Sequence, residues 1–367
     1  MIAAPASLRR RRCEATAEPP IRLMIVDDSS VARAVLARML SADPGFEVAA
    51  LAGHAGEALD ALKSVAVDIV LLDVEMPGTN GIDALPEILA AGNGARVLIV
   101  SSMAEDGAEV TVRALAEGAA DTLPKPGTGY FAGRFSEVLA DRLRRIGRAR
   151  RQQKGGASAA PAAPIRLRAM PDRELGCLAL GASTGGPHPL TELLRALPER
   201  IGVPILVTQH LPPVFIPYFV RQLEGACGRA VCVAEDGRAL TDDLVHVAPG
   251  EAHLCLERGG GVVRIRLGRE RAPSGCLPSL DPMLASVAAT FGAAAVGVVL
   301  SGMGRDGLAG SHRLVERGGA MLVQDRGSAA IWGMPRAVAE AGLASAVLPP
   351  RELARRIAEC AEGRSWK

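Results

Sequence analysis

The 367-residue sequence has no apolar run as long as the roughly 18 residues that a membrane span requires. Residues 1–20 contain arginines but no apolar segment behind them, so we expect a flexible extension there and not a secretory signal. The seven cysteines include no Cys-x-x-Cys pair and no histidine at zinc spacing, which argues against a structural zinc site. The simplest interpretation is a cytoplasmic protein with reduced thiols and no membrane insertion.

An excess of charge of one sign is also lacking, because 42 basic and 40 acidic residues leave a net charge of only +2. Such a balance provides no global field that would attract nucleic acid. The arginine-rich start of residues 142–164 has no aromatic neighbours, and no helix-turn-helix pattern follows it, so we interpret it as a solvated helix end. A docking surface for an acidic partner is the alternative.

The length suggests two domains of ordinary size. The stretch that separates them is rich in glycine, alanine, serine and proline, and it cannot bury enough apolar area to order itself. We therefore expect a first domain over residues 21–146, a flexible linker over 147–170 and a second domain over 171–362.

The first domain alternates short apolar runs with amphipathic helical stretches. This alternation predicts a parallel sheet covered by helices on both faces. Ligands of such sheets bind at the carboxyl ends of the strands. The expected strands are 21–26, 47–51, 69–72, 97–100 and 121–123.

Polar residues stand at the ends of these strands. Asp27 and Asp28 follow the first strand, Asp73 ends the third, Ser101 ends the fourth and Lys125 follows the fifth. Converging carboxylates repel each other unless a cation is present, and hard oxygen ligands suit Mg²⁺. A metal and a lysine would stabilise charge on a transferring phosphoryl group, so we infer that Asp73 accepts phosphate. For a lone Asp-Asp pair the alternative is a solvated helix cap.

The segments VDDSS, LLDVEMPGTNGID, VSS and LPKP, in this order, resemble the receiver domain of bacterial response regulators. The resemblance covers residues 21 to about 146 and implies a flavodoxin-like (βα)₅ fold. Thr122 departs from it, since receivers usually carry an aromatic switch residue there. The implied roles are phosphoacceptor for Asp73, Mg²⁺ ligand for Asp27, Asp28 and Asp73, and phosphate switch for Ser101 and Lys125.

The alternation of strands and helices returns in the second half and predicts a doubly wound α/β domain. The expected strands are 177–180, 203–207, 294–300, 321–323 and 346–348. A different pattern covers residues 230–267, where short apolar runs are separated by glycine-rich turns. The runs 244–248, 253–257 and 262–267 predict an antiparallel β-hairpin insert.

The sequence GASTGG, residues 181–186, forms a strand-to-helix turn with Ser183 at its centre. Glycines and a helix N-terminus suit either a phosphate site or a nucleophilic serine beside an oxyanion site. The dinucleotide fingerprint GxGxxG is absent, and a purely structural glycine turn remains an alternative. A nucleophilic serine needs a base, and the base needs an orienting acid.

Two further loops at carboxyl strand ends supply those partners. His210 follows a strand in TQHLPP, and Asp306 follows another in LSGMGRDGLAG. The order serine, histidine, aspartate differs from that of ordinary α/β-hydrolases, so we expect the same chemistry on another fold. The remaining histidines of the domain are expected to be exposed or structural: His188, His246, His253 and His312.

The ordered segments GASTGGP, TQHLPP, VAPGEAHL, PSLDPML, LSGMGRDGLAG and GMPRAV look like the catalytic domain of the CheB family of chemotaxis protein-glutamate methylesterases. This resemblance covers about residues 177–348. It implies a phosphorylation-activated hydrolase that removes methyl esters from glutamates, and deamidates glutamines, on methyl-accepting chemotaxis receptors. It further implies a chemotaxis histidine kinase as phosphodonor and no cofactor at the esterase site.

The resemblance also assigns site residues. Thr184 and the backbone N–H of Met303 would support the reacting group. Two residues depart from the family: Trp332 where a tyrosine is common, and Leu277 where an arginine or histidine is frequent. The implied triad is Ser183 as nucleophile, His210 as general base and Asp306 as its orienting partner.

Two rival functions stay open at this point. The second domain could bind a nucleotide or another effector without catalysis, as the output of a response regulator. A DNA-binding output is disfavoured by the balanced charge and the missing recognition helix. For regulation we expect the unphosphorylated first domain to pack over the Ser183 crevice, and phosphorylation to favour an open arrangement.

Overall fold

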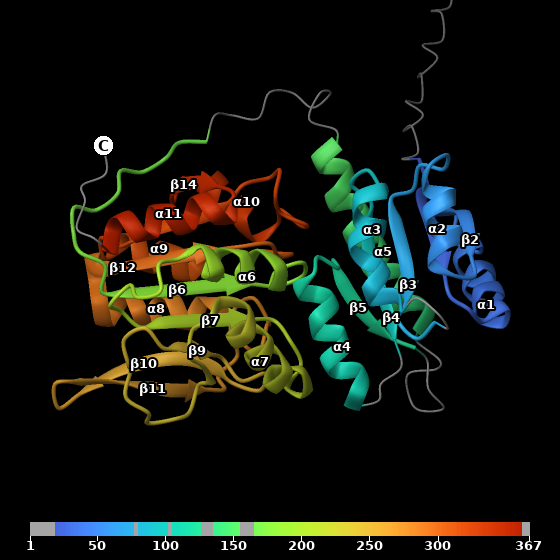
Figure 1. The fold of residues 1–367 in the computed structure, drawn as a ribbon. Coiled ribbons are helices and arrows are strands. Elements are labelled where there is room, and N and C mark those ends of the chain that lie inside the picture. The colour runs from blue at the N-terminus through green and yellow to red at the C-terminus, as the bar shows by residue number, and fades with distance from the viewer. Residues whose placement is uncertain (1–18, 77–79, 102–104, 126–134, 155–164, 362–367) are drawn as a thin grey trace, which may run out of the picture.

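The computed structural model describes residues 19–76, 80–101, 105–125, 135–154 and 165–361 (Figure 1). The expected extension therefore lies almost entirely outside the described residues, as does the central part of the expected linker. Within the described part, no helix is both long and apolar enough to span a bilayer.

The first unit is a five-stranded parallel sheet in the order β2-β1-β3-β4-β5, with helices on both faces, as predicted (Figure 1). Its central strand has the sequence IVLLD and is buried throughout, as expected of a strand covered on both sides. The elements are β1 (Ile21–Val26), α1 (Ser30–Ser41), β2 (Phe46–Ala52), α2 (Ala55–Leu62), β3 (Ile69–Asp73), α3 (Gly81–Ala91), β4 (Arg96–Ser101), α4 (Glu105–Ala116), β5 (Asp121–Pro124) and α5 (Phe135–Lys154).

Helix α5 extends past residue 146, where the linker was predicted to begin. Arg150, in the stretch interpreted as a solvated helix end, is only 4% exposed. Its guanidinium donates a hydrogen bond to the Val67 carbonyl (2.6 Å) and forms an ion pair with Asp68. The interpretation as a solvated helix end is therefore wrong for Arg150. The side chain can be buried because these two acceptors compensate its charge. The end of α5 belongs to the first unit.

The second unit has a seven-stranded sheet in the order β14-β13-β12-β6-β7-β9-β8, with parallel pairing throughout, and a separate antiparallel pair β10-β11. Helices cover both faces of the large sheet (Figure 1). The elements are β6 (Cys177–Ala182), α6 (Pro187–Ala196), β7 (Ile205–Gln209), η1 (Pro213–Phe215), α7 (Ile216–Cys227), β8 (Val231–Val233), β9 (Val245–Val247), β10 (His253–Gly259), β11 (Val262–Gly268), α8 (Leu280–Phe291), η2 (Gly292–Ala294), β12 (Ala295–Val299), α9 (Leu308–Glu316), β13 (Ala320–Gln324), α10 (Met334–Glu340), β14 (Ala344–Leu348) and α11 (Pro350–Ala361).

The predicted hairpin is present as β10-β11, but the run 244–248 does not belong to it. That run forms β9, which pairs in parallel with β7 and β8 in the large sheet. All three residues of β9 are buried, which suits a strand covered on both faces, whereas a half-exposed hairpin strand would alternate. The assignment of this run to the hairpin was therefore wrong.

The two units pack against each other through α4, which lies against α6 and α7 (Figure 1). Val112 of α4 is 1% exposed and belongs to the apolar core of the second unit. His188, at the start of α6, forms a hydrogen bond through Nδ1 with the Ala116 carbonyl at 2.8 Å. Leu211, the residue after His210, packs against apolar clusters of both units. The first unit thus contacts a loop that carries a predicted site residue.

Candidate active site

Ser183 lies in the turn between β6 and α6, and its backbone is fixed from both sides. Its N–H donates to the Ser301 carbonyl (2.9 Å), and its carbonyl accepts from the Gln209 side-chain amide (2.9 Å). Gly185 has φ +67°, a conformation that glycine adopts without strain, and a Cβ there would lie 2.3 Å from the Ala330 Cβ. The turn therefore needs its glycines to bring Ser183 between the neighbouring strand ends.

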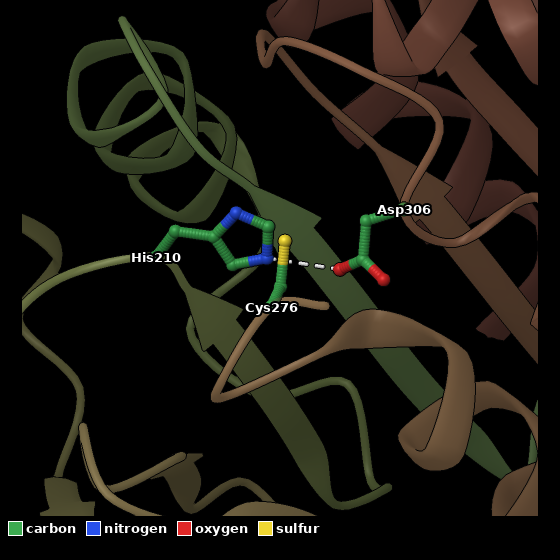
Figure 2. A group of neighbouring side chains, drawn as sticks. All are labelled: His210, Cys276 and Asp306. Carbon is green, nitrogen blue, oxygen red and sulfur yellow. Dashed lines mark hydrogen bonds and ion pairs between the residues drawn. The ribbon is translucent and has the colours of Figure 1, made fainter. Parts of the chain in front are cut away.

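The structure brings Ser183, His210 and Asp306 into one hydrogen-bonded chain. The His210 Nδ1 lies 3.0 Å from the Ser183 Oγ. On the other side of the ring, Nε2 lies 2.9 Å from the Asp306 Oδ2 (Figure 2). An ionised carboxylate can only accept, so Nε2 carries the proton in this pair. In the neutral ring, Nδ1 is then free to accept the hydroxyl proton of Ser183. This is the arrangement that a serine nucleophile with a general base requires.

Hydrogen bonds from the N-terminus of α8 help to keep the Asp306 carboxylate ionised. Its Oδ1 accepts from the Ser279 hydroxyl (2.5 Å), and its Oδ2 accepts from the Leu280 backbone N–H (2.7 Å). Burial acts to raise the pKa of Asp306, but the hydrogen bonds from His210, Leu280 and Ser279 together lower it to about 2. The carboxylate is therefore charged over the whole physiological range.

The surroundings of the His210 ring favour its protonated form. Burial acts to lower its pKa, but the hydrogen bonds and charges of Asp306 and Cys276 outweigh burial and raise the pKa of His210 to about 9. The ring is thus predominantly an imidazolium at neutral pH, and it acts as a base only after losing that proton.

Of the two predicted supporting residues, Met303 follows a glycine that lies against the nucleophile. A Cβ on the preceding Gly302 would lie 2.9 Å from the Ser183 Cβ, so this loop lies against the serine. In the described part of the chain the Met303 N–H engages no hydrogen-bond acceptor. Thr184 is half-buried in the serine turn, and its carbonyl accepts from the Ser301 hydroxyl at 2.9 Å.

Three residues of this site were not predicted from the sequence. Gln209 and Ser279 position Ser183 and Asp306, as described above. Cys276 lies beside His210 and Asp306, although the sequence showed it only as one of several scattered cysteines (Figure 2). Ser279 belongs to PSLDPML, a segment that resembles the methylesterase family, and this resemblance was the signal that could have identified it. Nothing local marks Cys276, because its neighbours come from distant loops.

Among the described residues, none of the other histidines of the second unit hydrogen-bonds Ser183. His188 and His312 are exposed, as expected. His253 is buried and bonds the Glu270 carbonyl and the Ser279 N–H, a structural role in the loop between β11 and α8. His246 belongs to β9 of the large sheet and not to the hairpin, and burial lowers its pKa to about 4.

The predicted acidic pocket forms at the carboxyl ends of β1 and β3. Ligand oxygens of Asp27, Asp28 and Asp73 lie within 4.8 Å of one another. The Lys125 Nζ lies 2.6 Å from the Asp73 Oδ2 and 3.1 Å from the Asp27 Oδ2. Burial raises the pKa of Asp73, and the hydrogen bond from Lys125 partly offsets it. Three hard oxygen donors fit Mg²⁺. The Ser101 side chain lies outside the described residues.

Two family profiles match the chain, one for each unit. "Response regulator receiver domain" matches residues 23–129, and "CheB methylesterase" matches residues 178–357. Curated relatives match along nearly the whole length. Protein-glutamate methylesterase/protein-glutamine glutaminase 1 of Paramagnetospirillum magneticum is 36% identical over 91% of this chain and 94% of its own. The enzyme of the same name numbered 2 from Caulobacter vibrioides is 39% identical over 90% of this chain and 95% of its own.

Proposed function

Because the chain belongs to the CheB methylesterase family, with a receiver domain in front, we propose that it demethylates glutamate methyl esters on methyl-accepting chemotaxis receptors. It also deamidates glutamines there, as the names of its relatives indicate for those enzymes. The observation that carries this proposal is the hydrogen-bonded chain from Ser183 through His210 to Asp306. The described cysteines are free thiols, which supports a cytoplasmic location.

In the first half-reaction, the Ser183 Oγ attacks the ester carbonyl of the glutamate side chain. Nδ1 of His210 takes the hydroxyl proton, and the Asp306 carboxylate stabilises the imidazolium that forms. The Met303 N–H and the turn around Thr184 stabilise the negative oxygen of the tetrahedral intermediate. The intermediate collapses to a glutamyl ester of Ser183, and His210 returns its proton to the departing methanol.

In the second half-reaction, water attacks the glutamyl ester while Nδ1 of His210 accepts a water proton. The products are a free glutamate side chain and regenerated Ser183. With a glutamine substrate, ammonia leaves in place of methanol and the same acyl enzyme forms. One acyl-enzyme route therefore accounts for both activities.

In the receiver, Asp73 is the proposed phosphoacceptor, and the donor is a chemotaxis histidine kinase. Asp27, Asp28 and Asp73 would hold Mg²⁺, which supplies charge neutralisation for the phosphoryl group. The position of the Lys125 ammonium, 2.6 Å from Asp73, supports a role in contacting the phosphoryl oxygens together with Ser101.

We infer that the receiver controls access to Ser183 through the loops that it contacts. Leu211 follows His210 and packs against the receiver core. Arg96 of β4 donates a hydrogen bond to the Ala329 carbonyl (3.0 Å), and Ile331 is buried with receiver residues. The Ile331 carbonyl in turn accepts a hydrogen bond from the N–H of Gly302, the residue before Met303. Phosphorylation at Asp73 shifts the population toward an arrangement in which these loops accept substrate.

Methanol release from methylated receptor membranes tests the esterase. We expect the Ser183→Ala variant to lose about 10⁵-fold or more in rate, as for triads that act as a unit. Ser64→Ala, at an exposed serine of the receiver, is the matched control and should retain the full rate. A loss below about tenfold in Ser183→Ala would contradict a nucleophilic role.

The rival function, an output domain that binds a nucleotide or effector without catalysis, makes the opposite prediction. Retention of the chain on a nucleotide resin, together with no methanol release from methylated receptors, would support it. The continuous match to curated methylesterases does not favour this rival.

A further inference from the structure

The sulfur of Cys276 lies against the ring nitrogen of His210 that faces Asp306 (Figure 2). One ligand atom each from His210, Cys276 and Asp306 lies within 4.8 Å of the others. The proposed hydrolysis does not use the thiol, so the chemistry described above leaves it unexplained.

The three donors form a set typical of a soft divalent ion. Imidazole nitrogen, thiolate sulfur and carboxylate oxygen are the ligands that zinc takes in proteins. Zn–S bonds of about 2.3 Å and Zn–N or Zn–O bonds of about 2.0–2.2 Å place tetrahedral ligand atoms roughly 3.3–3.6 Å apart. The His210 Nε2 and Asp306 Oδ2 lie 2.9 Å apart and the sulfur lies within 4.8 Å of both, so the observed spacings bracket this range.

The loop that carries Cys276 is held in place at both ends. His253 bonds the Glu270 carbonyl (2.7 Å) at the start of this loop and the Ser279 N–H (2.9 Å) at its end. Asp306 is itself oriented by hydrogen bonds from Ser279 and Leu280. Such outer contacts hold ligands in position and strengthen a metal site.

We propose that Cys276, His210 and Asp306 form an inhibitory site for a thiophilic divalent ion such as Zn²⁺. Bonds form from the ion to Sγ of Cys276, Nε2 of His210 and a carboxylate oxygen of Asp306. The thiol proton and the Nε2 proton of the imidazolium pass to water, and the ring keeps the proton on Nδ1. The two negative ligands balance the charge of the ion.

Occupation of this site removes the base from Ser183. With the ion on Nε2, the ring keeps its proton on Nδ1, which then donates to the Ser183 Oγ and accepts nothing from it. The site differs in chemistry from the receiver pocket, where three carboxylates favour a hard ion such as Mg²⁺. The two ions therefore act on different halves of the molecule.

Inhibition of the purified full-length chain, stripped of metal with EDTA, tests the proposal and rests on the proposed esterase function. We expect buffered free Zn²⁺ to lower methanol release by at least about 100-fold, the contribution of a general base, and EDTA to restore it. Cys276→Ser should need at least about 100-fold more Zn²⁺ for the same inhibition, each rate being normalised to that variant without metal. Cys232→Ser is the matched control, because its sulfur also lies beside a histidine, 3.5 Å from the His246 Nδ1. This control should respond like the unmodified chain.

Metal binding is measured separately with Co²⁺ in place of Zn²⁺. We expect a thiolate-to-cobalt charge-transfer band in the unmodified chain and in Ser183→Ala, and its loss in Cys276→Ser and Cys276→Ala. Equal zinc inhibition of Cys276→Ser and the unmodified chain, or no thiolate band, would overturn the proposal. A band that depends on Cys276 in a chain without esterase activity would support the metal site and refute the proposed function alone.

Discussion

At the scale of single residues, the state of the His210 ring governs the proposed chemistry. The ring can accept the Ser183 proton only when Nδ1 is unprotonated. Asp306 on one side and Cys276 on another both favour the imidazolium, against the effect of burial. The same contacts that orient the base therefore also limit the fraction of molecules in which it is ready.

This balance predicts the pH dependence of catalysis. Since the pKa of His210 is raised to about 9, the neutral ring is fully present above that pH and is lost as the pH falls through it. We expect kcat/KM, measured with EDTA present, to rise with pH with a midpoint near 9. Asp306→Asn should move the midpoint to lower pH and reduce the rate by about 10⁴-fold, as when a triad loses its carboxylate. A midpoint near 6.5, the ordinary value for histidine, would contradict the raised pKa.

At the scale of elements, the N-terminus of α8 holds Asp306, the acid of the proposed triad. Ser279 is the N-cap of this helix and bonds Asp306 through its hydroxyl, and Leu280 offers the first free N–H of the helix. Helix N-termini carry partial positive charge and stabilise carboxylates. The helix thus positions Asp306 and keeps it ionised.

Substitution of Ser279 tests this role. Hydrogen bonds to charged groups contribute about 1.5–3 kcal/mol, so Ser279→Ala should lower kcat/KM by roughly 10- to 100-fold. Ser279→Thr keeps the hydroxyl and should restore most of the rate. The pH profile distinguishes positioning from general destabilisation, because loss of the hydrogen bond to Asp306 also shifts the midpoint for His210. An unchanged profile with a lower rate would argue against positioning through Asp306.

The sequence was sufficient for those elements that follow local patterns. Strands such as β3 and β6 were predictable because continuous apolar runs indicate buried parallel strands. Ser183, His210 and Asp306 could be expected to meet because each follows such a strand. The position of β9 was missed, since the short run 244–248 does not reveal its partner strand. Cys276 was missed for the same reason, because its neighbours in space are remote in sequence.

At the scale of the whole molecule, α4 connects the two halves. β4 ends at Ser101, beside the acidic pocket, and α4 begins at Glu105 and packs on the second unit. The face of α4 that contacts α6 and α7 includes the buried Val112. A change near Asp73 can therefore reach the loops around Ser183 through one helix.

Opening of this contact should activate the enzyme without phosphorylation. Val112→Asp buries a charge in the interface, which disfavours the closed arrangement. If the free energy of the closed arrangement rises by about 1.4 kcal/mol relative to the open one, the open population increases roughly tenfold. We expect methanol release without phosphodonor to rise by about that factor. Val31→Asp, at a valine that is 71% exposed on α1, is the control and should leave the rate unchanged. No increase in Val112→Asp would argue that α4 does not restrain the esterase.

Leu211 is adjacent to His210 and packs against the receiver. This contact implies that binding at the Ser183 crevice also affects the receiver. Coupling free energies between two sites are reciprocal. If phosphorylation at Asp73 makes the Ser183 crevice bind receptor more tightly, a bound receptor must stabilise the phosphorylated receiver by the same factor. A methylated receptor would then act on the receiver as an effector as well as on the esterase as a substrate, and its binding would favour the phosphorylated, active state.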